Sequence, residues 1–236
     1  MTRPFLILGL LAALGCGVAP RALAQTQTSS AVSSNPSSVV VPGISRNIDG
    51  IAARIEDSII TESEVRELGA FQQLVDGHSK SRDEIIRELA DQWVVRQEAA
   101  ATNYKQPSDE AVDAAYKQLI KQFASPAEFQ NRLDAVGLSE AAVRRLLRAQ
   151  LYLSRFLDYR FRPAAQVDEK EIQAYYDNEL VPQLKKRGEN IPPLDDVEDT
   201  IREVLIQRAI DDHSAKWLDE TRERLKIEII PPGDAS

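Results

Sequence analysis

The stretch RIEDSIITESEVREL (residues 54–68) decides how the folded part of this chain begins. It predicts a short β segment, a tight turn, a second short apolar segment and then a helix. The helix start is marked by Thr61 and Glu64, which form a T-x-x-E capping box, and by Ile60 and Val65 at the spacing of a hydrophobic staple. Because an isolated two-stranded hairpin is only marginally stable in water, another segment of the chain must pair with it or pack over it.

A second strand candidate lies near the other end of the sequence. In KIEII (residues 226–230), Ile227 and Ile229 alternate with polar neighbours, as a half-buried strand requires. We expect this segment to pair with residues 51–56, so that the domain is closed by its own two ends.

The apolar spacing between these two segments predicts helices almost throughout. We expect a long central helix from Ser139 to Pro163, and an irregular connection at residues 180–194, where Pro182, Pro192 and Pro193 interrupt the pattern. The other helices are predicted to begin at Thr61, Ser81, Ser108, Ser125, Asp168 and Leu194. The predicted fold class is mostly α, a helical cradle with a small antiparallel sheet joining the N-terminal hairpin to the C-terminal strand.

Residues 1–24 have the pattern of a secretory signal peptide, with Arg3, an apolar run and an A-x-A ending at Ala24. Lipid attachment at Cys16 is an alternative, although Ala13 stands where such sites usually carry leucine. An uncleaved membrane anchor is a third option. Residues 25–46 are rich in Ser, Thr, Pro and Gln, and are predicted to be a flexible linker before a domain at 47–231 and a tail at 232–236.

The charge balance argues against two classes of partner. The formal net charge is −8, and cleavage after Ala24 would remove Arg3 and Arg21 and make it −10. So negative a chain is a poor binder of nucleic acid or of an anionic membrane. Cleavage would also remove Cys16, the single cysteine, so the mature chain would have no disulfide and no thiolate metal site.

No motif in the sequence points to a catalytic or metal site. The pair Asp212-His213 could suggest one. At helical spacing, however, only Asp and Glu of ordinary surface character could act as a third ligand, so a solvated helix face is the simpler interpretation. His78 stands beside a glycine, and G-x-S-x-G, P-loop, G-x-G-x-x-G and H-E-x-x-H motifs are absent. We therefore expect no catalytic residue, no metal and no cofactor.

The remaining candidates for function are apolar and aromatic. Aromatic residues at helical spacing are usually core, but some could line a groove for extended segments of other chains. Phe123 and Phe129 are the better groove candidates because they border the Ser125 turn, whereas Phe156 and Leu157 are expected in the core beside Tyr159 and Phe161. The predicted client-binding residues are Tyr116, Phe123, Phe129 and Leu133.

The order of these segments resembles the N-terminal domain of the SurA-type periplasmic chaperones and related parvulin-type foldases. The segments that carry the resemblance are DGIAARIEDSIITESEV, RDEIIRELADQWVVRQEA, PSDEAVDAAYKQLIKQF, FQNRLDAVGLSEAAVRRLLRAQLYLSRF and VDEKEIQAYYDNE. IREVLIQRAIDDHSAKWLDETRERLKIEII is similar to the helix and strand that return to that domain in the family. The resemblance covers nearly all of residues 51–231 and rests on helix pattern and order, without a catalytic signature.

The chain departs from this family at one place. Family members typically carry parvulin prolyl-isomerase domains before the returning helix, but here only residues 180–194 lie there, too few to build a domain with its own core. The resemblance therefore implies ATP-independent holding of unfolded or outer-membrane-bound polypeptides in the periplasm, without isomerase activity. The alternatives are a structural or adaptor protein with one fixed partner, self-association, including a strand-swapped homodimer, and a residual isomerase. No stable membrane insertion is expected after cleavage.

Overall fold

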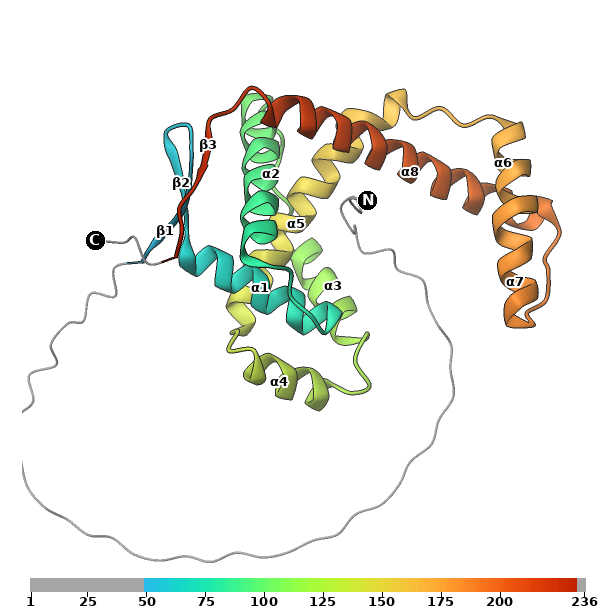
Figure 1. Ribbon diagram of the computed structural model, residues 1–236. Coiled ribbons are helices and arrows are strands. Elements are labelled where there is room, and N and C mark those ends of the chain that lie inside the picture. Colours follow the sequence, from blue (N-terminus) through green and yellow to red (C-terminus); the bar gives the residue numbers. More distant parts are fainter. Residues whose placement is uncertain (1–48, 233–236) are drawn as a thin grey trace, which may run out of the picture. The chain divides into compact units, whose positions relative to one another are not determined.

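A three-stranded antiparallel sheet joins the two ends of the folded chain (Figure 1). In the computed structural model, which describes residues 49–232, strand β1 (Ile51–Ile55) lies between β2 (Ser58–Thr61) and β3 (Ile227–Ile229). Both neighbours run antiparallel to β1. The pairing of the N-terminal hairpin with the C-terminal strand, predicted from the sequence, is therefore confirmed.

The two faces of the sheet differ in burial because successive side chains of a strand point to opposite sides. Ile55 is 0% exposed and Ile60 is 5% exposed, and both belong to the core beneath the sheet, whereas Ile59 is 53% exposed. On β3, Ile227 and Ile229 are half-buried and pack against the same core. The returning strand thus covers core residues of the hairpin.

The turn of the hairpin is held by the residue that precedes β3. Glu56 has a φ of +47°, a left-handed conformation that is costly for a residue with a side chain. Its backbone N–H donates to the carbonyl of Lys226 at 3.1 Å, and its carboxylate accepts from the backbone N–H of Lys226 at 2.7 Å. The C-terminal segment therefore fixes the turn as well as the edge of the sheet.

Side-chain caps begin the first helices where the sequence predicts them. Thr61 and Ser81 each accept from the N–H of a glutamate three residues on, whose carboxylate accepts from the cap in return. Gly77, with a φ of +74°, ends the first helix as expected. These helices are α1 (Glu62–Asp76), α2 (Arg82–Ala101), α3 (Asp109–Ile120), α4 (Pro126–Ala135) and α5 (Glu140–Phe161).

The start of α4 differs from those of α1 and α2 in the contact that its glutamate makes. Ser125 Oγ accepts from the N–H of Glu128 at 3.1 Å, as predicted for the start of α4. The Glu128 carboxylate, however, accepts from the N–H of Ala124 at 3.0 Å rather than from Ser125. The glutamate therefore stabilises the turn before α4 as well as the helix itself.

The second half of the chain contains more helix than the sequence predicts. It comprises η1 (Arg162–Ala164), α6 (Glu169–Tyr175), a π-helical turn η2 (Tyr176–Leu180), α7 (Val181–Arg187) and α8 (Leu194–Arg222). The expectation of an irregular connection at residues 180–194 is wrong for α7 and holds only for the residues after it.

Pro182 explains this difference. Inside an α-helix, a proline lacks its N–H and clashes with the carbonyl four residues earlier. Here Pro182 stands in the first turn of α7, directly after the wider π turn, where its missing N–H costs little. Gly188, with a φ of +68°, then ends α7.

Helix α5 lies at the centre of the helical part, as its apolar pattern predicts. It packs against α1, α2, α3 and α8. Its buried residues Val143 and Leu147 belong to one apolar cluster shared with α1, α3 and α4. Tyr152, Leu153, Phe156 and Leu157 belong to another, shared with α2 and α8. The described residues all fall in one compact unit.

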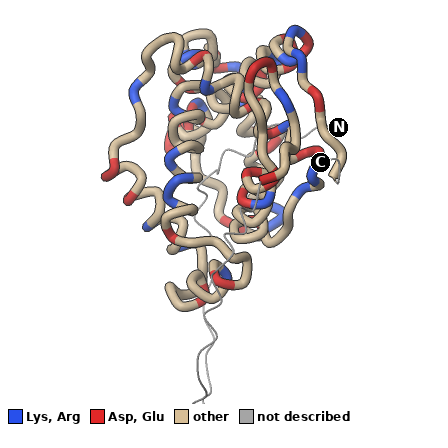
Figure 2. Tube along the Cα trace, turned by 90° about the vertical axis from the view of Figure 1, so that its left-hand side faces the viewer, with Lys and Arg blue, Asp and Glu red and all other residues tan. Residues whose placement is uncertain are grey.

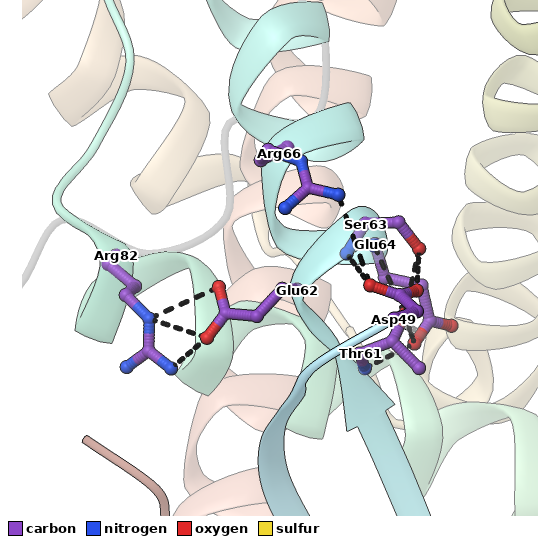
Figure 3. A network of polar contacts seen from close by, with 7 residues as sticks. All are labelled: Asp49, Thr61, Glu62, Ser63, Glu64, Arg66 and Arg82. Carbon is purple, nitrogen blue, oxygen red and sulfur yellow. Dashed lines mark hydrogen bonds and ion pairs between the residues drawn. The ribbon is translucent and has the colours of Figure 1, made fainter. Parts of the chain in front are cut away.

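A network of polar contacts surrounds the start of α1 (Figure 3). Asp49 accepts from the N–H of Ser63 at 3.0 Å, adding an acceptor to the first turn of α1. Arg82, at the start of α2, forms an ion pair with Glu62 and donates to the carbonyl of Ile230 at 2.8 Å. One guanidinium therefore joins α1, α2 and the residue after β3.

The predicted signal peptide (residues 1–24), including the Cys16 alternative, and the predicted linker (residues 25–46) lie outside the described residues. Within residues 49–232, none of the helices has the length and apolar character needed to span a membrane.

Candidate functional site

The histidines do not assemble a metal site within residues 49–232. His213 is exposed on α8, and its ring stacks on Phe161 with 6.5 Å between centroids. His78 lies within 3.0 Å of the carbonyl of Asp76. Nowhere in this described part of the chain do three His, Cys, Asp or Glu side chains gather as metal ligands.

The four predicted client-binding residues do come together, at what we call the aromatic corner: Tyr116, Phe123, Phe129 and Leu133. The ring of Phe129 packs edge-on against Tyr116 and Phe123, with centroid separations of 5.7 and 5.1 Å. Tyr116 is 7% exposed, and Phe129 and Leu133 are 2% exposed. They form part of the core cluster shared by α1, α3, α4 and α5.

Only Phe123 gives the aromatic corner an accessible ring. It is half-buried, and the guanidinium of Arg132 lies 5.5 Å from its centroid. Phe129 and Leu133 are the two buried side chains by which α4 packs against the body. A client could contact Phe129 or Leu133 only if α4 moved, so their predicted role in client binding stays a prediction.

A more accessible aromatic site lies where the segment after α2 meets α5. We call it the Tyr159 pocket. It is an open depression of about 480 Å³, lined by Thr102, Asn103, Tyr104, Lys105, Gln106, Arg155 and Tyr159. Tyr159 is 64% exposed, and no other Phe, Tyr or Trp side chain of residues 49–232 is exposed to a comparable degree. A single exposed apolar side chain is common on protein surfaces, so this ring matters because it stands at a depression that Tyr104, Lys105 and Arg155 also line.

The floor of the Tyr159 pocket is held by aromatic contacts and hydrogen bonds. The Tyr104 ring lies 5.4 Å from those of both Tyr159 and Phe156, and its hydroxyl donates to the carbonyl of Arg155 at 3.0 Å. Phe156 is 1% exposed and therefore fixed in the core. The Tyr159 pocket is thus attached to the central helix α5 rather than to a free loop.

The local sequence explains the turn that forms one wall. The hydroxyl of Thr102 donates to the carbonyl of Ala99 at 3.0 Å and terminates α2. Asn103 follows with a φ of +53°, a conformation that asparagine tolerates better than most residues. Residues 104–108 then continue without helix or strand structure, up to the cap of α3. This segment brings Tyr104 and Lys105 to α5.

The electrostatics of the Tyr159 pocket differ from those of its surroundings. Acidic and basic residues are interspersed along the described chain (Figure 2). The other arginines of α5 each form an ion pair with a carboxylate; they are Arg144, Arg145, Arg148 and Arg160. Among the described residues, no carboxylate lies within ion-pair distance of Arg155 or Lys105, and both line the pocket. The charged groups of the pocket wall are therefore cationic.

One ionic pair is buried between α2 and α8. Asp91 Oδ1 lies 2.9 Å from Nε of Arg222, although neither atom makes a hydrogen bond of normal geometry. Burial raises the pKa of Asp91 to about 6, and this effect outweighs the opposing attraction of Arg222. Asp219 and Glu88 raise the same pKa further. The pair links the end of α8 to α2.

The sequence indicated parts of the Tyr159 pocket but not the pocket itself. Tyr159 was expected among aromatic residues at the end of the central helix, and Phe156 and Leu157 are buried there as predicted. The missed partner is Tyr104, which comes from a non-helical segment with no periodic signal. The spacing of Arg155 and Tyr159, four residues apart on one helix face, was a usable sign.

Comparison with known proteins adds no assignment: no protein-family model and no curated protein matches this chain. Any function must therefore be inferred from the fold and from its sites.

Proposed function

We propose that this protein binds extended hydrophobic and aromatic segments of unfolded exported polypeptides, outer-membrane proteins among them, in an ATP-independent, chaperone-like manner. The observation that carries the proposal is the Tyr159 pocket, with its 64% exposed ring placed on the rigid central helix. The resemblance to SurA-type chaperone domains, and the sheet closed by the two chain ends, support it. The export and periplasmic location rest on the pattern of residues 1–24.

The contacts available fit weak, reversible holding. An aromatic ring of a client stacked on Tyr159 would contribute about 0.5–1.5 kcal/mol beyond the apolar area that it buries. Micromolar affinity corresponds to about −8 kcal/mol, so one pocket needs help from neighbouring contacts along the client. Phe123 at the aromatic corner is the next accessible ring.

The same geometry supports one rival, an adaptor with a single fixed partner. In the described residues, the large apolar or aromatic side chains that are more than about a third exposed are Ile59, Tyr159 and Ile191. They come from β2, α5 and the segment after α7, so they do not belong to one element. A discrete pocket without a broad apolar surface is also what an adaptor with one selective partner would present.

We propose no enzymatic activity for this protein. Between α6 and α8 stand only η2, α7 and a short segment, and these elements are too small for an isomerase domain with its own core.

The experiment that separates holding from a fixed partner uses two unrelated clients. Each is denatured chemically and diluted with and without a several-fold molar excess of the protein, and aggregation is followed by light scattering. A holding protein suppresses aggregation of both clients. If aggregation of both is unchanged, the chaperone proposal fails and the adaptor remains.

A further inference from the structure

Arg155 differs from the other arginines of α5 because, within residues 49–232, it has neither a carboxylate partner nor an aromatic ring beneath its guanidinium. Arg144 and Arg160 each form an ion pair and also lie over an aromatic ring. Within residues 49–232, Arg155 has no carboxylate within ion-pair distance and no ring beneath its guanidinium. It is exposed and lines the Tyr159 pocket beside Lys105.

The side chains of Arg155 and Tyr159 are neighbours, because residues four apart on a helix have Cβ atoms about 5–6 Å apart. Lys105 approaches the same depression from the segment after α2. Two cations and one exposed ring therefore surround a single depression in a chain whose formal net charge is −8. A guanidinium of this kind is suited to pair with a carboxylate through charge-assisted hydrogen bonds.

We propose that the Tyr159 pocket recognises a carboxylate located next to an aromatic side chain on an extended peptide, with Arg155 and Lys105 binding the carboxylate and Tyr159 stacking on the ring. This inference rests on the proposed peptide-binding function and names the chemistry that the site selects. The carboxylate has two possible sources, the C-terminus of a chain that ends in an aromatic residue, and an Asp or Glu side chain beside one.

The backbone geometry makes a clean test available. The carbonyl of Arg155, not its side chain, accepts the hydrogen bond from the Tyr104 hydroxyl. Arg155→Gln therefore removes the charge and leaves the floor of the pocket intact. Arg87→Gln is the matched control, because Arg87 is exposed on α2 and precedes Thr102 by four turns of helix, about 22 Å.

The test measures fluorescence anisotropy with three short labelled peptides that share an uncharged fluorophore at the N-terminus. The first ends in phenylalanine with a free carboxylate, the second is its C-terminal amide, and the third is the amide with an aspartate next to the phenylalanine. At low ionic strength, the free carboxylate should bind the wild-type protein roughly three- to tenfold more tightly than the amide.

Arg155→Gln should clearly reduce this ratio, because Lys105 alone then faces the carboxylate, without weakening binding of the amide, while Arg87→Gln should preserve the ratio. Recovery of affinity by the aspartate peptide would assign the site to side-chain carboxylates as well as to chain ends, and failure to recover would restrict it to chain ends.

Equal binding of the carboxylate and amide peptides by the wild-type protein overturns the carboxylate inference but leaves peptide holding in place. If neither peptide binds the wild-type protein, and Tyr159→Ala leaves the suppression of client aggregation unchanged, the proposed function itself fails.

Discussion

Deleting residues 226–236 should destabilise the whole domain, because it removes β3 from a sheet whose central strand is β1. Ile227 and Ile229 are half-buried, and each loses roughly 1 kcal/mol of apolar stabilisation. Ile55, now 0% exposed, gains solvent contact at a further cost of about 1 kcal/mol. The apolar part of the loss is therefore about 3 kcal/mol.

The loss of hydrogen bonds adds to this loss of stability. The N–H of Glu56 loses the carbonyl of Lys226, the carbonyl of Ala52 loses the N–H of Ile230, and Arg82 loses the carbonyl of Ile230. Water replaces these partners at an open edge, so the net cost is about 0.5 kcal/mol each. The total comes to roughly 4–5 kcal/mol, a large share of the 5–15 kcal/mol that holds a typical domain together.

Urea unfolding followed by circular dichroism measures this loss. With a slope of about 2 kcal/mol per molar urea, the midpoint should fall by roughly 2 M. Truncation after Pro232 is the matched control, because it leaves β3 and its contacts in place. If the two truncated proteins unfold at the same urea concentration, the claim that the chain ends close the domain is wrong.

Three further predictions concern the core and the chemistry. Because the pKa of Asp91 is raised from 3.8 to about 6 on folding, the native state binds more protons there between these values. The contribution of Asp91 should therefore reduce the unfolding free energy by about 2 kcal/mol as pH rises from 4 to 7. Urea titrations should show this slope disappear in Asp91→Asn, and an unchanged slope would contradict the assignment. Phe129→Ala should cost about 3–5 kcal/mol of stability, because this side chain is 2% exposed. Phe123→Ala should cost only about 1 kcal/mol, because Phe123 is half-buried. Similar midpoints of the two variants in chemical denaturation would refute this ranking. A proline-peptide isomerisation assay should give the uncatalysed rate at any protein concentration, and clear acceleration would show that an isomerase site exists.

The helix starts could be predicted because their signals are local. A hydroxyl or carboxylate at the cap and a glutamate three residues later satisfy backbone N–H groups wherever the helix is placed, as Thr61, Ser81 and Asp168 do here. The pairing of β3 with β1 could also be predicted, since a lone hairpin needs support and few other segments alternate in the required way.

Helix α7 could not be predicted from the same signals. Whether Pro182 breaks a helix depends on the turn that precedes it, and the π turn at Tyr176–Leu180 has no simple sequence signature. The grouping of Tyr116, Phe123, Phe129 and Leu133 followed from helical spacing, but spacing alone does not say how much of each ring α4 covers. Exposure is decided by tertiary packing.

The Tyr159 pocket shows the same limit for a site. Arg155 and Tyr159 share a face of α5, which spacing predicts, but the pocket exists because Tyr104 arrives from a segment without periodicity. Likewise, the sequence cannot show that Arg155 has no carboxylate partner among the described residues, because the partners of the other α5 arginines come from other helices.

The central claim is that clients bind at the Tyr159 pocket, and site-specific photocrosslinking tests it most directly. A photoreactive phenylalanine analogue is placed at Tyr159, at Phe123 or at Ile59, which is 53% exposed on β2 and provides the control. After mixing with a denatured outer-membrane protein and illumination, we expect covalent adducts from position 159, fewer from 123 and none above background from 59. Adducts from 59 equal to those from 159, or none from 159, would contradict the assignment of this pocket as the binding site.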